Sequence, residues 1–307
     1  MADKIIIGLH GLANKPSKDN LYNWWLKSIN EGLDWIDAGV QISADQFKFF
    51  YWADSMYIKP LSEDEEWDSP FKLDSPYAPA QNRPLPYKST FKNRMDIAFA
   101  KDVNDFLYNH GFTGILNKIA VPIVATTMKE LDVYSDKTRR FFENYTASEY
   151  LTGQLYQILK ESQGMSVMLI GHSMGSYICY ETLKHNPDVV VDQLITIGSP
   201  LSLLGFKKGI SEHQSDYPTC TWPVVPSNVR AWKNFIDWND PVIMKSLATL
   251  REYYLTADGQ EMIEDFLVDN SYTFQNAQGE RVSDHHKSYG YLRCPEVAAS
   301  ILAFLQD

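Results

Sequence analysis

The fold is decided by the stretch Met165-Ser166-Val167-Met168-Leu169-Ile170-Gly171-His172-Ser173-Met174-Gly175. An apolar run of strand length ends at Ile170, and a run with helical spacing of apolar residues follows from 177 to 183. The turn between them is so tight that the residues two before and two after Ser173 must be small, and both are glycine. The stretch therefore predicts a strand, a sharp turn and a helix, with the Ser173 hydroxyl at the positive end of that helix.

Strand-like and helix-like runs alternate along the rest of the chain. Apolar runs typical of buried strands occupy residues 5–9, 47–52, 191–197 and 229–235, and residues 272–274 are a candidate for a short last strand. Helical spacing occurs at 20–36, with Asp19 or Asn20 as the N-cap, and at 295–305. This alternation predicts an α/β protein with a mostly parallel sheet that is flanked by helices on both faces.

Residues 54–145 interrupt this alternation. They begin with an acidic, proline-rich stretch and continue with helical patterns at 91–107 and 115–145. We interpret them as a helical and loop insertion before the Ser173 turn, within a single domain of residues 1–307. The apolar positions between 116 and 124 fit either packing against the sheet or a cap or lid that faces a substrate.

Composition indicates which partners and which compartment to expect. The 307-residue chain has a net charge of −11, which argues against nucleic acid and anionic lipid as partners. Its three cysteines are widely spaced and indicate neither a disulfide framework nor a metal site. The first apolar run is too short for a signal peptide, and no run is long enough to span a bilayer. We expect a cytoplasmic protein without stable membrane insertion that acts on a small molecule.

A serine hydroxyl becomes a nucleophile only when an imidazole takes its proton and a carboxylate orients that imidazole. Asp240 follows the strand at 229–235 and precedes a proline, and Asp237 is its rival. His286 lies before the last helix, where a base would be expected, and His285 is its rival. We favour Ser173, Asp240 and His286.

An oxyanion formed at this site would need two hydrogen-bond donors. The backbone N–H groups of Met174, directly after the serine, and of Leu12, after His10-Gly11, are placed for this role. An ordinary strand-to-helix turn is the alternative reading of Leu12. A metal site at 284–286 is the weaker alternative for the histidines, because no further ligands are evident. We therefore predict neither a metal nor an organic cofactor.

These motifs, in this order, resemble the α/β-hydrolase superfamily: His10-Gly11, the Gly171–Gly175 turn, Gly198-Ser199-Pro200, Asn239-Asp240-Pro241-Val242 and the late His286. The central motif with its downstream Gly-Ser-Pro is similar to lipase and esterase members. The resemblance covers the chain apart from the insertion. It implies Ser173 as nucleophile, Asp240 as acid, His286 as base, and Leu12 and Met174 as the oxyanion hole.

The sequence thus predicts a serine hydrolase that cleaves a carboxylic ester or related acyl bond through an acyl-enzyme. The same three residues would also serve a thioesterase or an amidase. A noncatalytic protein that binds a small ligand on the same fold is a further alternative. The acyl group and the oligomeric state are left open.

Overall fold

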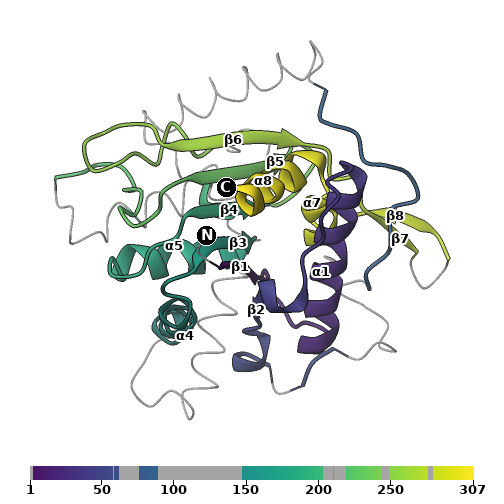
Figure 1. Ribbon diagram of the computed structural model, residues 1–307, viewed down its shortest axis with the longest axis horizontal. Helices are drawn as coiled ribbons and strands as arrows, with labels where there is room; N and C mark the ends of the chain where they lie inside the picture. Colours follow the sequence, from purple (N-terminus) through teal and green to yellow (C-terminus); the bar gives the residue numbers. More distant parts are fainter. Residues whose placement is uncertain are drawn as a thin grey trace, which may run out of the picture.

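The structure is a computed structural model that describes residues 3–57, 59–61, 76–88, 147–202, 210, 219–243, 249–275 and 279–307. Its main element is a six-stranded sheet in which every neighbouring pair is parallel (Figure 1). In chain order the strands are β1 (Lys4–Leu9), β2 (Phe47–Phe50), β3 (Ser166–His172), β4 (Gln193–Ile197), β5 (Trp232–Asp237) and β6 (Ile263–Val268). Their order in the sheet is β2-β1-β3-β4-β5-β6. The predicted α/β class with a parallel sheet is confirmed.

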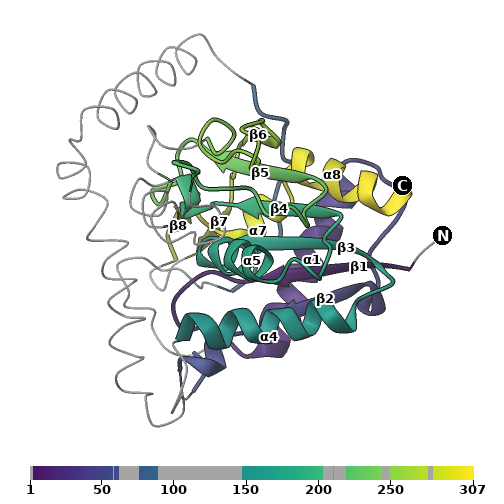
Figure 2. The same ribbon diagram turned by 90° about the vertical axis from the view of Figure 1, so that its left-hand side faces the viewer.

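Helices cover both faces of the sheet. On one face lie α4 (Ala147–Glu161) and α5 (Met174–His185), and on the other lie α1 (Lys18–Trp35), α7 (Ser288–Leu292) and α8 (Pro295–Gln306), as Figures 1 and 2 show. Successive residues of β1 divide between the two layers, as the alternation of a strand requires. Ile5, Ile7 and Leu9 pack with α4 and α5, whereas Ile6 packs with α1 and α8. None of the helices in the described ranges is both long and apolar enough to cross a membrane.

The order of the strands determines where a site can form. From β1 the chain moves to β2 on one side and then returns to β3 on the other side. In open parallel sheets ligands bind where the strand order changes direction in this way, which here is at the carboxyl ends of β1 and β3. The segment after β1 contains Leu12, and the residue after β3 is Ser173.

The last strands of the chain differ from the expectation in two ways. The last strand of the main sheet is β6, which the sequence did not predict because Glu264 and Asp265 interrupt its apolar run. Residues 272–274 do not extend the main sheet. They overlap β7 (Thr273–Gln275), which pairs antiparallel with β8 (Arg281–Ser283) in a separate two-stranded sheet.

The start of α1 also differs from expectation. Its N-cap is Ser17, whose hydroxyl accepts a hydrogen bond from the N–H of Asn20, rather than Asp19 or Asn20. The helix begins earlier because a serine at this position satisfies a free N–H of the first turn, and Asp19 then lies in that turn, near the positive end of the helix dipole.

Short 3₁₀ helices complete the described elements: η1 (Ala44–Gln46), η2 (Ala53–Ser55) and η3 (Pro200–Ser202). Most of the predicted insertion, including the helical patterns at 91–107 and 115–145, lies outside the described residues. Its described part at 76–88 contacts α1, where the Tyr77 hydroxyl and the Ala80 N–H both donate to Glu31. The cap or lid and the single-domain organisation stay predictions.

Candidate active site

The turn at Ser173 has a strained backbone. β3 ends at His172 and α5 begins at Met174, so Ser173 alone makes the turn, with φ of 51° and ψ of −125°. Residues other than glycine rarely adopt positive φ, and those that do cluster at functional sites. This conformation places Ser173 at the tip of the turn between the strand and the helix.

The two glycines of the motif are required by close packing. A Cβ at Gly171 would lie 2.6 Å from the Cα of Ser176, and a Cβ at Gly175 would lie 2.6 Å from the carbonyl oxygen of His10. Both neighbours are backbone atoms, which cannot move away as the end of a flexible side chain can. The glycines thus let α5 approach both its own strand and the end of β1.

We expect Gly175→Ala to destabilise the protein. Its methyl group would press against the carbonyl oxygens of Leu9 and His10 at 2.8 and 2.6 Å, and overpacking of this kind costs about 1–3 kcal/mol or more. Urea unfolding measures the free energy of unfolding. The control is Gly153→Ala in α4, where nothing lies within 4 Å of the new Cβ. Alanine should stabilise that helix by about 0.5–1 kcal/mol. Equal stability changes in the two variants would contradict the close packing.

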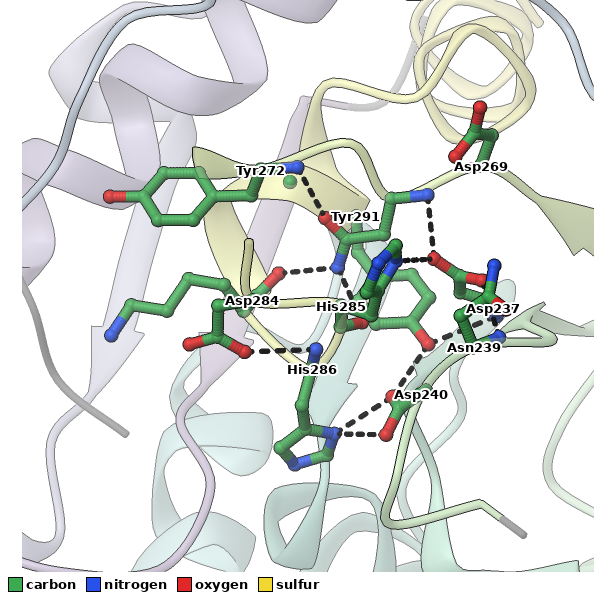
Figure 3. A network of polar contacts seen from close by, with 12 residues as sticks. Asp237, Asn239, Asp240, Asp269, Tyr272, Asp284, His285, His286 and Tyr291 are labelled. Atoms are coloured by element: carbon green, nitrogen blue, oxygen red, sulfur yellow. Dashed lines mark hydrogen bonds and ion pairs between the residues drawn. The ribbon is translucent and has the colours of Figure 1, made fainter. Parts of the chain in front are cut away.

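Asp240 and His286 form a buried pair. The Nδ1 of His286 lies 2.9 and 2.8 Å from the two carboxylate oxygens of Asp240 (Figure 3). The His286 side chain is only 5% exposed, and the Asp240 side chain is 0% exposed. Asp240 Oδ1 also accepts from the Val242 N–H, and Asp284 Oδ1 accepts from the backbone N–H of His286. Two loops that are far apart in the sequence are therefore joined at one hydrogen-bonded pair.

The electrostatics of this pair favour a strong base. Burial by itself lowers the pKa of His286, but the charge of Asp240 and its hydrogen bond outweigh burial. The pKa of His286 therefore lies above its ordinary value of 6.5. Because Nδ1 faces the carboxylate, it carries a proton in the neutral ring, which leaves Nε2 able to accept one.

Asp237 and His285, the alternative acid and the alternative base, form a second pair. The Nδ1 of His285 lies 2.8 Å from Asp237 Oδ2, and the His285 side chain is 31% exposed. The hydrogen bond to Asp237 raises the pKa of His285 above its ordinary value, although partial burial opposes the shift. Asp237 also accepts from the N–H groups of Asn239 and Asn270, so its carboxylate holds loops together. The adjacent histidines thus contact different carboxylates.

His172, within the Ser173 turn, connects that turn to the His286 loop. Its Nε2 lies 2.7 Å from the carbonyl oxygen of His286, and the two rings are 4.8 Å apart. Burial, and then the charge of His286, lower the pKa of His172 well below its ordinary value. A neutral ring that contacts a carbonyl through Nε2 carries its proton there. His172 therefore donates this hydrogen bond.

The end of β4 packs against the same pair. Gly198 has φ of +55°, and a Cβ there would lie 3.1 Å from Asp240 Oδ2 and 3.2 Å from two atoms of the His286 ring. The N–H of Ser173 donates to the carbonyl oxygen of Ile197, at 3.1 Å. The carboxyl ends of β3, β4 and β5 therefore meet around Ser173, Asp240 and His286.

The loop after β1 is held against the Ser173 turn. A Cβ on Gly11 would lie 2.8 Å from the Cβ of Ser173. His10 Nε2 accepts from the N–H groups of Trp52 and Ala53, so its Nδ1 is the donor to the Gly11 carbonyl, at 2.7 Å. In a trans peptide the C=O and N–H point in opposite directions, so this bond directs the Leu12 N–H away from the His10 ring.

The family model for lecithin:cholesterol acyltransferase matches residues 140–236, a stretch that contains Ser173 and ends within β5. The match and the parallel sheet with helices on both faces are consistent with an α/β-hydrolase fold. The match supports an acyltransferase-type or esterase-type serine hydrolase in general. A comparison with curated proteins found no match.

The predicted site residues are close together in the structure but not all in direct contact. Asp240 and His286 are hydrogen-bonded, and Gly11 and His172 connect Ser173 to the Leu12 loop and to His286. Among the contacts of the described residues there is no hydrogen bond between the Ser173 hydroxyl and His286. The N–H groups of Leu12 and Met174 donate to no backbone carbonyl within the described ranges.

The sequence analysis missed four polar residues of the candidate site. These are His172, His10, Asn270 and Tyr291. Asn270 donates to the carbonyl oxygens of His285 and Lys287, so it holds the backbone on both sides of His286. Of the four, only His10 and His172 could have been found from the sequence, because both lie within motifs of the predicted site. Asn270 and Tyr291 lie outside every motif. No group of three or more metal-ligating side chains occurs among the residues that the structure describes.

Proposed function

We propose that this protein is a serine hydrolase that cleaves a carboxylic ester through an acyl-enzyme intermediate. Ser173 is the nucleophile, His286 the base and Asp240 the acid. The observation that carries the proposal is the buried His286–Asp240 pair at the carboxyl ends of the strands, beside a serine held at positive φ. The proposal also requires a hydrogen bond from the Ser173 hydroxyl to His286 Nε2. In enzymes without bound substrate this bond is often long.

The proposed reaction has two steps. The Ser173 oxygen attacks the ester carbonyl while its proton passes to His286 Nε2, and Asp240 stabilises the resulting imidazolium. The tetrahedral oxyanion accepts hydrogen bonds from the Leu12 and Met174 N–H groups. The C–O bond to the alcohol breaks, and the alcohol leaves with the proton from His286. Water, deprotonated by His286, then attacks the acyl-serine, releases the acid and restores Ser173. Every proton moves among Ser173, His286, substrate and water.

Labelling and turnover test the proposal. A fluorophosphonate probe should attach to Ser173, as mass spectrometry of the digested protein would show, and p-nitrophenyl esters of short acyl chains should be hydrolysed. A noncatalytic binding protein would give neither result across a series of chain lengths. Labelling at another serine would reject the assignment of the nucleophile.

Acyl transfer to an alcohol is the second candidate, and the match to the lecithin:cholesterol acyltransferase family favours it. In that case an alcohol takes the place of water in the second step. Adding increasing concentrations of an alcohol to the ester assay would then produce a new ester at the expense of free acid. Thioester and amide substrates in the same assay would separate a thioesterase or amidase from an esterase.

The rate should depend on pH through His286. The imidazole must be neutral to take the serine proton, and its pKa is raised above 6.5. Activity is therefore lost as the pH falls through the raised pKa. We expect the acid limb of kcat/KM for a p-nitrophenyl ester to lie above 6.5. His285→Gln should keep this limb, because His285 contacts Asp237 instead. A limb below 6.5, or one that disappears in His285→Gln, would contradict the assignment of the base.

Other expectations from the sequence stay predictions. They are a small-molecule acyl substrate, a cytoplasmic location, the absence of nucleic-acid partners and of membrane insertion, and a reaction without metal or organic cofactor.

A further inference from the structure

Tyr291, near the end of α7, contacts Asp237 and Asp240, the two aspartates of the turn that follows β5. Its hydroxyl donates to Asp240 Oδ2 at 2.7 Å and accepts from the backbone N–H of Asp237 at 3.0 Å (Figure 3). The side chain is fully buried. Both hydrogen-bonding roles of the hydroxyl are therefore used, and its proton is directed at the carboxylate.

The hydroxyl completes the set of donors around Asp240. Oδ1 accepts from the Val242 N–H at 2.9 Å, and both oxygens lie within 2.9 Å of His286 Nδ1. Tyr291 supplies a further donor on Oδ2, the oxygen that the Val242 N–H does not contact. Hydrogen bonds to an ionised carboxylate are roughly twice as strong as neutral ones, and a buried carboxylate depends on them for its charge. The Val242 N–H and the Tyr291 hydroxyl thus each donate to a different oxygen of the carboxylate.

Tyr291 also connects the acid to the segment that carries the base. α7 begins at Ser288, directly after the His286 loop, and the acid turn is closed by a bond from the Asp240 N–H to the Asp237 carbonyl. One hydroxyl therefore links this turn to the helix that follows His286. Rotation of the Asp240 carboxylate away from the imidazole would break the bond to Tyr291.

We propose that Tyr291 is a positioning residue, whose hydroxyl orients the Asp240 carboxylate toward His286 and draws part of its negative charge away from the imidazole. This inference rests on the proposed function, in which that pair activates Ser173. Tyr291 acts through Asp240 and has no contact with the substrate in the proposed reaction.

The charges around His286 determine how the proposal is tested. Asp240 and Asp284 raise its pKa, Lys15 from the loop after β1 lowers it, and the neutral His172 from β3 packs against its ring. Replacement of the Tyr291 hydroxyl leaves Asp284, Lys15 and His172 in place and, of the groups around His286, acts on Asp240 alone. A shift in the pH profile would therefore come from the altered Asp240 carboxylate.

The test is Tyr291→Phe in the full chain, with a p-nitrophenyl ester as substrate. We expect kcat to fall about tenfold with KM almost unchanged, since a hydrogen bond to a charged group is lost and only the reaction step uses it. The acid limb of kcat/KM should move up by about half a pH unit, because the carboxylate then stabilises the imidazolium more strongly. Loss of packing alone would not move this limb.

Tyr289→Phe is the matched control on the same helix. The Tyr289 ring packs against Trp24, Tyr77 and Tyr272. Removing its hydroxyl should leave the acid limb where it is in the unmodified protein. Thermal unfolding of both variants shows whether they fold.

A second substitution keeps the proposal testable if Tyr291→Phe does not fold. 3-Fluorotyrosine at position 291 keeps the hydroxyl and makes it a stronger donor, so the acid limb should move to lower pH. An unchanged limb in a folded Tyr291→Phe, or a shift opposite to the expected one in either variant, overturns the proposal. Failure of the proposed function would appear separately, as absence of phosphonate labelling and ester hydrolysis in the unmodified protein.

Discussion

Ser173→Ala should reduce kcat for ester hydrolysis by roughly 10⁴-fold to 10⁶-fold, the loss expected when the nucleophile of an acyl-transfer site is removed. Without the hydroxyl no acyl-enzyme can form, and what activity remains comes from binding and the oxyanion donors. Alanine should fold as well as serine does, since Ser173 contributes its backbone N–H and carbonyl to the turn, and alanine keeps both. Steady-state kinetics, phosphonate labelling and urea unfolding together measure the effect.

Ser176→Ala is the matched control for this substitution. The Ser176 hydroxyl bonds to the carbonyl of Ser173 and to Ser199 Oγ, so it supports the turn. We expect this variant to lose stability but to keep phosphonate labelling at Ser173. If Ser173→Ala retained near-normal turnover, or if Ser176→Ala alone abolished labelling in a folded protein, Ser173 would not be the nucleophile.

Asp240→Asn should reduce kcat by about 10³-fold to 10⁴-fold, with little change in the fold. The carboxylate accepts the proton of His286 Nδ1, whereas an amide can turn its NH₂ group toward the ring instead. Nδ1 then becomes the acceptor, and the ring proton moves to Nε2, where it blocks transfer from Ser173. Loss of the negative charge also lowers the pKa of His286, because Asp240 is the main group that raises it. Kinetics over a range of pH separate the two effects.

Asp237→Asn is the comparison that separates the two acid candidates. Asp237 contacts His285 and the N–H groups of Asn239 and Asn270, so its substitution should lower stability and change kcat far less than Asp240→Asn does. The same order is expected for His286→Gln and His285→Gln. A larger loss of activity in Asp237→Asn would make Asp237 the acid in place of Asp240.

Much of the fold could be predicted because its signals are local. The apolar run of β1, the turn at Ser173 and the start of α5 follow from spacing and from the steric demand for glycine at 171 and 175. The sixth strand could not be predicted in this way. Asp265 lies in the middle of β6, where it accepts from Asn234 Nδ2 and from the N–H groups of Leu250 and Arg251. An acidic residue in this strand is tolerated because residues elsewhere in the sequence donate hydrogen bonds to its carboxylate.

The amino-acid sequence alone determined which residue types could do the chemistry and the order of the elements that carry them, because glycine sterics, apolar periodicity and the reactivity of serine depend on near neighbours. Only the tertiary structure decided which histidine contacts which carboxylate: His286 and Asp240 are 46 positions apart, and His285 and Asp237 are 48 apart. It also placed Tyr291 of α7 against Asp240, and Asn270 against the backbone on both sides of His286. Such pairings depend on how loops at the ends of parallel strands meet in space, which spacing along the chain does not encode.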